Sequence, residues 1–418
     1  MRTLATAMAT VSNTATSARG STDRRLGIAP GHKVIARAGI AAGALLAAAV
    51  FVPASLADWA AVDHAPTAAK IAPWNASAAA AAAAALGADP RKPEVRELVR
   101  RALARDLTLI PAIEVRALDL ALSGKTTKAR ALFQLSDQLS RRNLPTRLWL
   151  IQDAVDHGDV AGALKNFDIA LRTTTDAQPI LFPVLAKASG DPSLTVPIAR
   201  TLDRPSDWRL MFFEWALTNP AHVGGVASVA AEMRDRQFLV GNSIDQRLVE
   251  RLVTDRDFAA ASVLNRRLGR ESGGVADSHF ADPSAHYPFG WGLVSDGSLT
   301  AERAVAGSSA VLRYGAEPPH GGQIAAQLLM LRPGRYELAT RTAGRATGEA
   351  PYWSVSCGEV GGGELARLAQ PAKAGGEANT TFTVPASCGA QWLTLRVPPS
   401  GDASPPSGAI AWVQVLPR

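Results

Sequence analysis

Apolar residues recur at helical spacing between about residue 74 and residue 270, in short segments separated by glycine, proline, asparagine and aspartate. This spacing is typical of helices with one buried face, and the separating residues are typical of tight turns. Helices are predicted over 76–86, 94–105, 112–122, 127–139, 146–156, 160–171, 245–253 and 257–268. Further turns at 190–192, 203–205 and 219–220 continue the pattern, but the number of helices between 179 and 245 stays open. The segment 74–270 is therefore predicted to be an array of paired helices.

The pattern changes at Gly273-Gly274, where helical spacing gives way to short apolar or alternating segments bounded by glycine and proline. Such segments are typical of strands in an antiparallel sandwich. Strands are predicted over 310–314, 324–331, 335–341, 352–357, 380–384, 391–397 and 409–416. Residues 275–418 are thus expected to form a second domain, a β-sandwich with a hydrophobic core of its own.

Within the helical segment, several positions recur at an interval of 34 residues. A proline opens the first helix of each unit, a glycine ends it, and the second helix carries a small alanine and a phenylalanine. The recurring positions are Pro111, Pro145, Pro179, Gly124, Gly158, Ala129, Ala163, Phe133 and Phe167. The interval and the residue types resemble the tetratricopeptide repeat over 107–175. The resemblance implies an α-solenoid scaffold that binds protein partners, and it does not imply any reaction.

The C-terminal segment resembles a second family. Its Pro-Phe-Gly-Trp sequence at 288–291 and its Leu-x-Pro-Gly-x-Tyr sequence at 331–336 are similar to those of jelly-roll carbohydrate-binding modules and galactose-binding-like domains. The resemblance implies a jelly-roll sandwich in which Pro333 and Gly334 form the turn before a core strand. It also implies glycan binding as one function of such domains, without identifying the sugar.

The formal net charge of +7 is concentrated near the N-terminus. Residues 1–37 contain six basic residues and one acidic residue, whereas 38–57 carry no charge. A basic segment followed by an apolar one is typical of a chain whose N-terminus stays in the cytoplasm while the remainder is exported. The charge therefore indicates membrane topology, and no nucleic-acid partner is expected.

Two outcomes of this signal stay open. Residues 34–57 form either an uncleaved anchor in the inner membrane, for which their apolar length suffices, or a signal peptide cleaved after Ala57. Residues 1–33 are predicted to be a disordered cytoplasmic arm, and 58–73 a linker. The protein is expected in a bacterial inner membrane facing the periplasm or, after cleavage, in the periplasm or outside the cell. A buried alanine-rich helix of a cytosolic protein is the alternative.

The chain has two cysteines, Cys357 and Cys388, and both lie in the predicted β-domain. In an oxidising compartment they would close a loop that stabilises the domain by about 3–4 kcal/mol in the chain-entropy treatment. Two free, buried thiols are the alternative. A metal site is not expected, because two cysteines without CxxC spacing or a nearby histidine supply too few ligands.

Sugar binding requires an exposed aromatic ring with polar neighbours, because the apolar face of a pyranose stacks on the ring. The candidates in the β-domain are Tyr287, Trp291, Tyr352 and Trp353. Since Tyr352 and Trp353 are adjacent in one predicted strand, their side chains should point to opposite faces of the sheet, one of them into the core. For every one of these rings, a place in the hydrophobic core is the alternative.

Residues 277–286 gather aspartates and histidines, and modules of the jelly-roll kind hold calcium through such oxygen ligands. The closing strand, 411–416, offers no acid, so we interpret 277–286 as a surface loop. The sequence has no dinucleotide-binding, P-loop, zinc-protease or nucleophile-elbow motif. We expect no cofactor, no metal and no catalysis.

Two functions are compatible with this organisation. The first is a non-enzymatic envelope scaffold that binds a protein partner through its helical repeats, in the assembly or export of a surface polysaccharide. The second is a glycan-binding protein that acts through its β-sandwich, with the helices as a spacer.

Overall fold

The computed structural model describes residues 64–270, 273–284, 286–358, 362–401 and 405–418. The predicted cytoplasmic arm and the apolar segment 38–57 lie outside the described residues. Within the described ranges, no helix combines the length and the hydropathy that a membrane span requires. The described residues divide into two compact units, of which the first ends at Gly124 and the second begins at Lys125.

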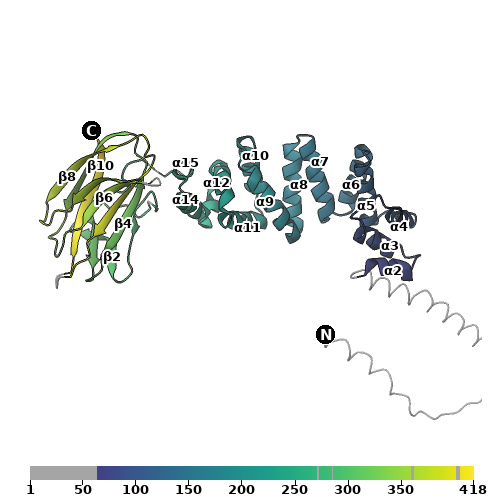
Figure 1. Ribbon diagram of the computed structural model, residues 1–418, viewed down its shortest axis with the longest axis horizontal. Coiled ribbons are helices and arrows are strands. Elements are labelled where there is room, and N and C mark those ends of the chain that lie inside the picture. Colours follow the sequence, from purple (N-terminus) through teal and green to yellow (C-terminus); the bar gives the residue numbers. More distant parts are fainter. Residues whose placement is uncertain (1–63, 271–272, 285, 359–361, 402–404) are drawn as a thin grey trace, which may run out of the picture. The chain divides into compact units, whose positions relative to one another are not determined.

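The described part of the first unit is helical (Figure 1). Its elements are α2 (Ala65–Ile71), α3 (Ala76–Ala85), α4 (Pro93–Leu103) and α5 (Ile110–Leu122). Helix α2 lies in the segment predicted to be a linker, so that prediction is wrong over 65–71. The helix forms because Ala68 and Ala72 are buried against Ala78 of α3, and these small side chains let the two helices pack closely.

The second unit begins with a longer series of helices. They are α6 (Thr126–Leu139), α7 (Leu144–Asp156), α8 (Val160–Thr173), η1 (Thr175–Ala177), α9 (Gln178–Ala188), α10 (Pro192–Leu202), α11 (Asp207–Leu217), η2 (Pro220–His222), α12 (Val223–Glu232), α13 (Arg236–Gly241), α14 (Ile244–Thr254) and α15 (Phe258–Arg267). The helices between 179 and 245, whose number the sequence left open, are thereby defined.

Local sequence explains where these helices begin and end. The Asn143 side chain accepts a hydrogen bond from the first turn of α7 and the Asp159 side chain accepts one from the first turn of α8, which satisfies backbone N–H groups that lack a partner inside the helix. Pro145 and Pro179 occupy the first turns of α7 and α9, where a proline costs no hydrogen bond. Gly158, at φ +71°, makes the left-handed turn that follows α7.

The recurring alanines and phenylalanines of the second helices are buried: Ala129, Phe133, Ala163 and Phe167. Phe133 stacks on Trp149 of α7, with ring centroids 4.3 Å apart. These positions therefore face neighbouring helices, as the 34-residue interval predicts. Membership of the tetratricopeptide family stays a prediction.

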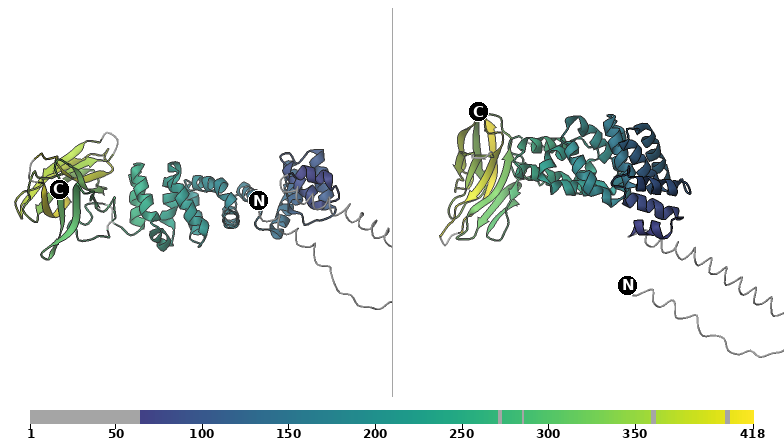
Figure 2. Two further views of the ribbon diagram at one scale, coloured as in Figure 1. Left: turned by 90° about the horizontal axis from the view of Figure 1, so that it is seen from below. Right: turned by 45° about the vertical axis from the view of Figure 1, so that its right-hand side comes forward.

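The C-terminal part of the second unit is an antiparallel sandwich of two sheets (Figure 2). Its strands are β1 (Gly292–Leu293), β2 (Leu299–Ala306), β3 (Ser309–Ala316), β4 (Gly322–Leu329), β5 (Gly334–Thr342), β6 (Tyr352–Cys357), β7 (Glu364–Ala369), β8 (Glu377–Val384), β9 (Gln391–Val397) and β10 (Ser407–Pro417). Sheet A has the order β1-β4-β9-β6-β7, and sheet B has the order β2-β3-β10-β5-β8. The predicted order of helices followed by an antiparallel sandwich is confirmed.

The hydrophobic core of the helices continues into the sandwich. Phe289, Leu328 and Ala390 belong to the same buried cluster as the residues of α12, α14 and α15. A Cβ atom on Gly358, just after β6, would lie 3.1 Å from the Phe258 ring of α15. The helices and the sandwich of the second unit therefore share a packed, apolar junction.

Candidate binding sites

The closing strand β10 presents a tryptophan on the outer face of sheet B. Ile410, Val413 and Val415 point into the sandwich core, so the alternation of the strand directs Trp412 outward. The pairing of β10 with β5 is irregular between Ile410 and Trp412, and such a bulge re-aims the side chains beside it. The indole is partly exposed.

A pocket of about 550 Å³ opens beside this ring. We call it the Trp412 pocket. Its lining includes His279, Ser309, Val311, Arg341, Ala411 and Trp412. Val311 is 2% exposed and forms an apolar wall, whereas His279 and Ser309 are exposed. The pocket therefore combines an aromatic surface with polar groups at its edge, which is the composition that ligand sites commonly have.

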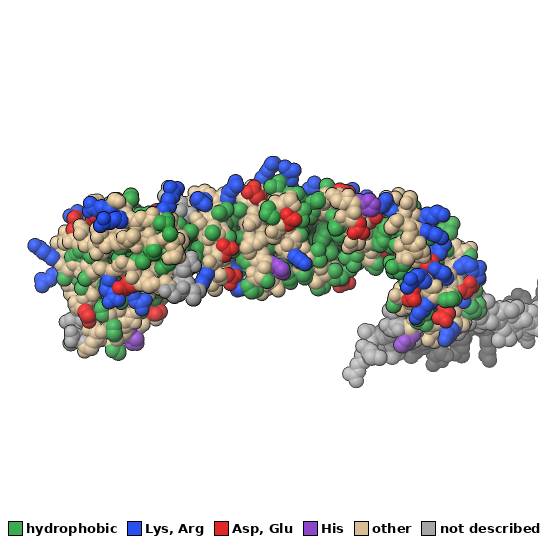
Figure 3. Space-filling view, turned by 45° about the horizontal axis from the view of Figure 1, so that its top comes forward, with side chains coloured by type: hydrophobic (Ala, Val, Ile, Leu, Met, Phe, Trp, Pro, Cys, Tyr) green, Lys and Arg blue, Asp and Glu red, His purple; other side chains and the backbone are tan. Residues whose placement is uncertain are grey.

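Arg341 of β5 stands directly opposite Trp412 in the strand register. Its Nε atom lies 3.7 Å from Oε1 of Glu377, and the two side chains are 49% and 60% exposed. An ion pair that is this long and this exposed to water contributes little to stability. The guanidinium group can therefore exchange this partner for a ligand at small cost. Figure 3 shows Lys and Arg side chains among apolar ones over the surface of the sandwich.

Two of the four aromatic candidates from the sequence are core residues. Trp353 is fully buried and Trp291 is 4% exposed, with their ring centroids 5.6 Å apart. The Trp353 indole N–H donates a hydrogen bond to Gln370 Oε1 at 3.0 Å. The Trp291 indole N–H donates one to the Asp277 carbonyl oxygen, also at 3.0 Å. Since the rings and their N–H groups are already engaged, Trp291 and Trp353 cannot be sugar platforms. This corrects the prediction for these two residues.

Tyr352 lies on the outer face of sheet A, opposite in direction to Trp353, as predicted from their adjacency. The guanidinium carbon of Arg367 is 4.5 Å from the centre of the Tyr352 ring. Glu364 accepts hydrogen bonds from Arg367 and from Ser354, and the Arg367 bond is the main cause that lowers the pKa of Glu364. One face of the Tyr352 ring is therefore covered by the guanidinium group of Arg367.

Tyr287 lies at the junction of sandwich and helices. Its ring stacks on Trp392 at 6.1 Å between centroids, and its carbonyl oxygen accepts a hydrogen bond from Gln246 of α14. Burial, and secondarily the charge of Glu250, raises the pKa of the Tyr287 hydroxyl. Although the residue is 40% exposed, these contacts show that the ring packs between the two parts of the unit.

The aspartates of the loop 277–286 bond within the loop and to β2. Asp277 accepts hydrogen bonds from the backbone of Ala281 and Asp282 and pairs with Arg303 at 3.2 Å. Asp282 accepts from the backbone and hydroxyl of Ser284. Among the described residues, no three His, Cys, Asp or Glu side chains gather closely enough to hold a metal ion. The loop lies on the surface, and its exposed His279 forms one side of the Trp412 pocket.

Cys357 and Cys388 form a disulfide, with Cα atoms 5.6 Å apart. The bond joins the end of β6 to the loop before β9. In the same region Gly358 donates a backbone hydrogen bond to Ala390, and Gln391 donates one to the Cys388 carbonyl oxygen. The predicted disulfide is confirmed, and it lies beside the junction with α15.

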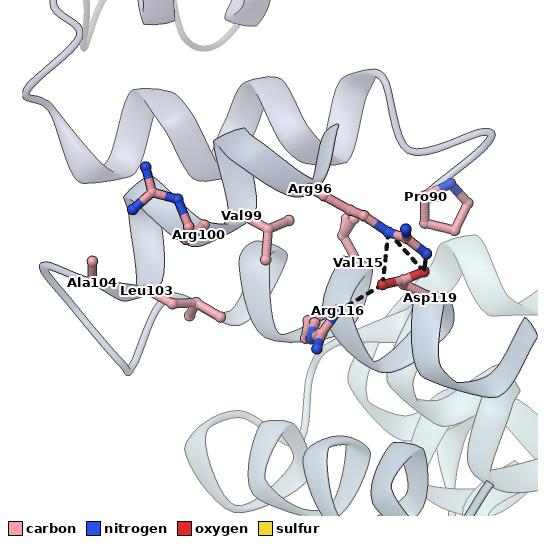
Figure 4. Close-up of a pocket in the computed structure, with 9 residues that line it drawn as sticks. All are labelled: Pro90, Arg96, Val99, Arg100, Leu103, Ala104, Val115, Arg116 and Asp119. Carbon is pink, nitrogen blue, oxygen red and sulfur yellow. Dashed lines mark hydrogen bonds and ion pairs between the residues drawn. The ribbon is translucent and has the colours of Figure 1, made fainter. Parts of the chain in front are cut away.

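The first unit has a groove of about 540 Å³ between α4 and α5 (Figure 4). Val99, Leu103 and Val115 give it an apolar wall. Arg96 and Arg116 converge on the buried carboxylate of Asp119, at 2.6 Å and 2.8 Å. Because one carboxylate holds two guanidinium groups, the wall of the groove keeps a net positive charge in a fixed position.

The sequence patterns missed Trp412, Arg341 and the Arg96–Asp119–Arg116 cluster. The sequence did contain a signal for Trp412. Val413 and Val415 fit alternating core positions, so the residue before Val413 should point outward. The partners across strands and helices could not be found, since Arg341 meets Trp412 only through the pairing of β5 with β10.

No protein-family model matches the chain, and no curated protein matches it in sequence. A solved structure described as "CBM4 structure and function" is similar, with TM-score 0.27 and 11% identity, over 34% of this chain and 99% of that one. TmCBM61 in complex with β-1,4-galactotriose has TM-score 0.24 and 14% identity, over 35% and 100%. The enzymatically active domain of bacteriophage CBA120 tailspike protein 4 has TM-score 0.26 and 13% identity, over 35% and 21%.

Proposed function

We propose that this protein is a glycan-binding protein that acts through the Trp412 pocket of its β-sandwich. The observation that carries the proposal is the partly exposed indole of Trp412 at a pocket of about 550 Å³ whose edge holds Arg341, His279 and Ser309. The C–H face of a pyranose would stack on the ring, while the side-chain donors at the edge would bond its hydroxyl groups.

Trp412 is a better platform than the four aromatic residues predicted from the sequence, because each of those rings is already engaged. The rings of Trp291 and Trp353 lie in the core. Arg367 covers one face of Tyr352, and Tyr287 stacks on Trp392. This difference gives the proposal a matched control, since Tyr352 is an outward aromatic residue of the same sandwich on the other sheet.

The test uses the full chain and affinity electrophoresis through gels that contain single soluble polysaccharides, neutral and acidic. The expected result is retardation of the wild type by at least one polymer, loss of this retardation in Trp412→Ala, and its persistence in Tyr352→Ala. Thermal unfolding of Trp412→Ala should stay close to that of the wild type, because the ring is partly exposed. Equal retardation of wild type and Trp412→Ala, or no retardation of the wild type by any polymer, would refute the proposal.

A second function, binding of a protein partner by the helical repeats, is favoured by the groove between α4 and α5. Its apolar wall and its fixed guanidinium pair would receive a segment that carries an apolar side chain next to an acidic one, as in helix-in-groove recognition. In this proposal the helices form a tetratricopeptide-type solenoid. Pull-down of envelope proteins by wild type but not by Leu103→Asp, whose side chain is partly exposed in the groove, would support it, and equal recovery by both would oppose it.

We further propose that the described part of the chain works outside the cytoplasm and binds without catalysing a reaction. The disulfide between Cys357 and Cys388 supports export, because such bonds persist in oxidising compartments. Together, an exported glycan-binding sandwich and a helical partner-binding region would suit the assembly or export of a surface polysaccharide. Cell fractionation with intact mass analysis tests the location. A reduced, full-length protein in the cytosolic fraction would contradict it.

A further inference from the structure

The ionisable side chains that line the Trp412 pocket are basic. Arg341 is its permanently charged side chain, and His279 is its other basic group. Among the residues that the structure describes, no aspartate or glutamate lines the pocket. Glu377 contacts Arg341 from the neighbouring strand β8, so it reaches the guanidinium group without lining the pocket. Once Arg341 leaves Glu377, a ligand in the pocket would therefore meet positive charge that no carboxylate among the described lining residues offsets.

The register of the sheet fixes where this charge lies relative to the ring. Arg341 of β5 and Trp412 of β10 are directly opposite in the antiparallel pair, and the Cβ atoms of such residues are about 4.5–5.5 Å apart. A pyranose stacked on Trp412 would thus have its exocyclic groups within reach of the Arg341 side chain. Arg341 is half exposed, so it can adjust without disturbing the core.

We propose that the Trp412 pocket selects acidic glycans, specifically polymers that contain uronic acids. The sugar ring stacks on Trp412, and the carboxylate that a uronic acid carries in place of a hydroxymethyl group pairs with the guanidinium group of Arg341. Arginine suits this role because its planar fork binds a carboxylate through two parallel hydrogen bonds. Glu377 is displaced in this step, since its single contact of 3.7 Å is long and exposed. The inference rests on the proposed function of glycan binding.

The experiment measures binding of the full chain to polygalacturonate, alginate and hyaluronan by calorimetry, each against its carboxyl-reduced counterpart. The reduced polymers keep the sugar backbone and lose the charge. Dextran sulfate serves as an anionic polymer without carboxylates. The variants are Arg341→Gln and, as matched control, Arg335→Gln, which removes an exposed arginine from the same strand and the same face of β5 but outside the pocket.

The expected result is that the wild type binds at least one uronate polymer about tenfold or more tighter than its reduced counterpart, as a charge-assisted pair implies. This preference should disappear in Arg341→Gln and persist in Arg335→Gln. The preference should also weaken as salt is added, because the pair lies near the surface.

Two outcomes would overturn the inference while leaving glycan binding intact: equal affinity for charged and reduced polymers with loss of both in Trp412→Ala, or a charge preference unchanged in Arg341→Gln. Binding of dextran sulfate as tight as that of the uronate polymers would also overturn it, since it would indicate general attraction of polyanions. Absence of binding to every polysaccharide would remove the proposed function together with the inference.

Discussion

Gly225 of α12 lies against the turn between α9 and α10. A Cβ atom built on Gly225 would be 2.7 Å from the backbone nitrogen of Gly190 and 2.8 Å from the carbonyl carbon of Ser189. Both atoms belong to the backbone, so neither can rotate away. The preceding residue, Gly224, is different: the nearest atom to its Cβ would be Asp257 Oδ2 at 3.4 Å, an ordinary contact. The two adjacent glycines of α12 therefore differ in the space that is available for a methyl group: Gly224 has room for one and Gly225 does not.

The two substitutions to alanine should have opposite effects on the free energy of unfolding. Both variants replace a helical glycine by alanine, and this replacement stabilises the helix by about 0.5–1 kcal/mol. In Gly225→Ala the methyl group must also push α12 away from the turn, and overpacking of this kind costs about 1–3 kcal/mol. Because the helix contribution cancels between the two variants, their stabilities should differ by about 1–3 kcal/mol. Gly224→Ala is expected to be the more stable and to exceed the wild type.

Urea unfolding of the full chain, followed by far-ultraviolet circular dichroism, measures this difference as a shift of the transition midpoint at unchanged slope. The order of midpoints should be Gly224→Ala, wild type, Gly225→Ala. If Gly225→Ala unfolds at the same urea concentration as Gly224→Ala, α12 does not approach the turn as closely as described, and the reasoning is refuted.

Three further predictions concern the sandwich and the helices. Trp353→Ala should destabilise the sandwich by about 3–5 kcal/mol, because it empties a fully buried site; a thermal midpoint close to that of the wild type would contradict this. The hydrogen bond from Arg130 lowers the pKa of Asp153 below its ordinary value of 3.8. The ionised Asp153 therefore stabilises the fold fully above pH 3.8, and this contribution is lost as the pH falls through the lower pKa of the folded state. Asp153→Asn lacks this contribution and should lose less stability than the wild type between about pH 6 and pH 3 in urea titrations. Replacing Cys357 and Cys388 by serine should cost about 3–4 kcal/mol, and an unchanged unfolding midpoint under non-reducing conditions would argue that the disulfide is absent in solution.

Helix positions were predictable where local chemistry marks both ends. The Asn143 and Asp159 caps and the left-handed Gly158 lie within the same few residues as the helices that they bound, so the sequence contains the whole signal. Helix α2 was missed because its alanine-rich sequence has little polar contrast, and its burial depends on contact with α3. Strand β2 was missed for a related reason: its two charged residues, Glu302 and Arg303, are adjacent, so it lacks a regular alternation of apolar and polar positions.

For the candidate sites, too, the sequence predicted the features that depend on neighbouring residues and missed those that depend on tertiary contacts. Adjacency in one strand was enough to predict that Tyr352 and Trp353 point in opposite directions. The pairing of the two cysteines was predicted for an oxidising compartment, with two free thiols as the alternative, and the structure shows them paired. Which of the two rings enters the core could not be decided, since that depends on the sheet that covers the strand. The pairing of Arg341 with Trp412 is likewise a consequence of strand register.

The sequence by itself determined the order of the two kinds of structure, the 34-residue interval of the helices and most helix ends, because each depends on short-range spacing or on residue type; it left the disulfide as one of two alternatives. Only the tertiary structure decided which aromatic rings face solvent, which cation stands beside Trp412, and how Asp119 holds two arginines from different helices. The physical reason is that burial and charge pairing arise between segments distant in the chain. The residue pattern of one segment predicts which of its faces is apolar and which is polar. Only tertiary packing decides which other segments contact each face.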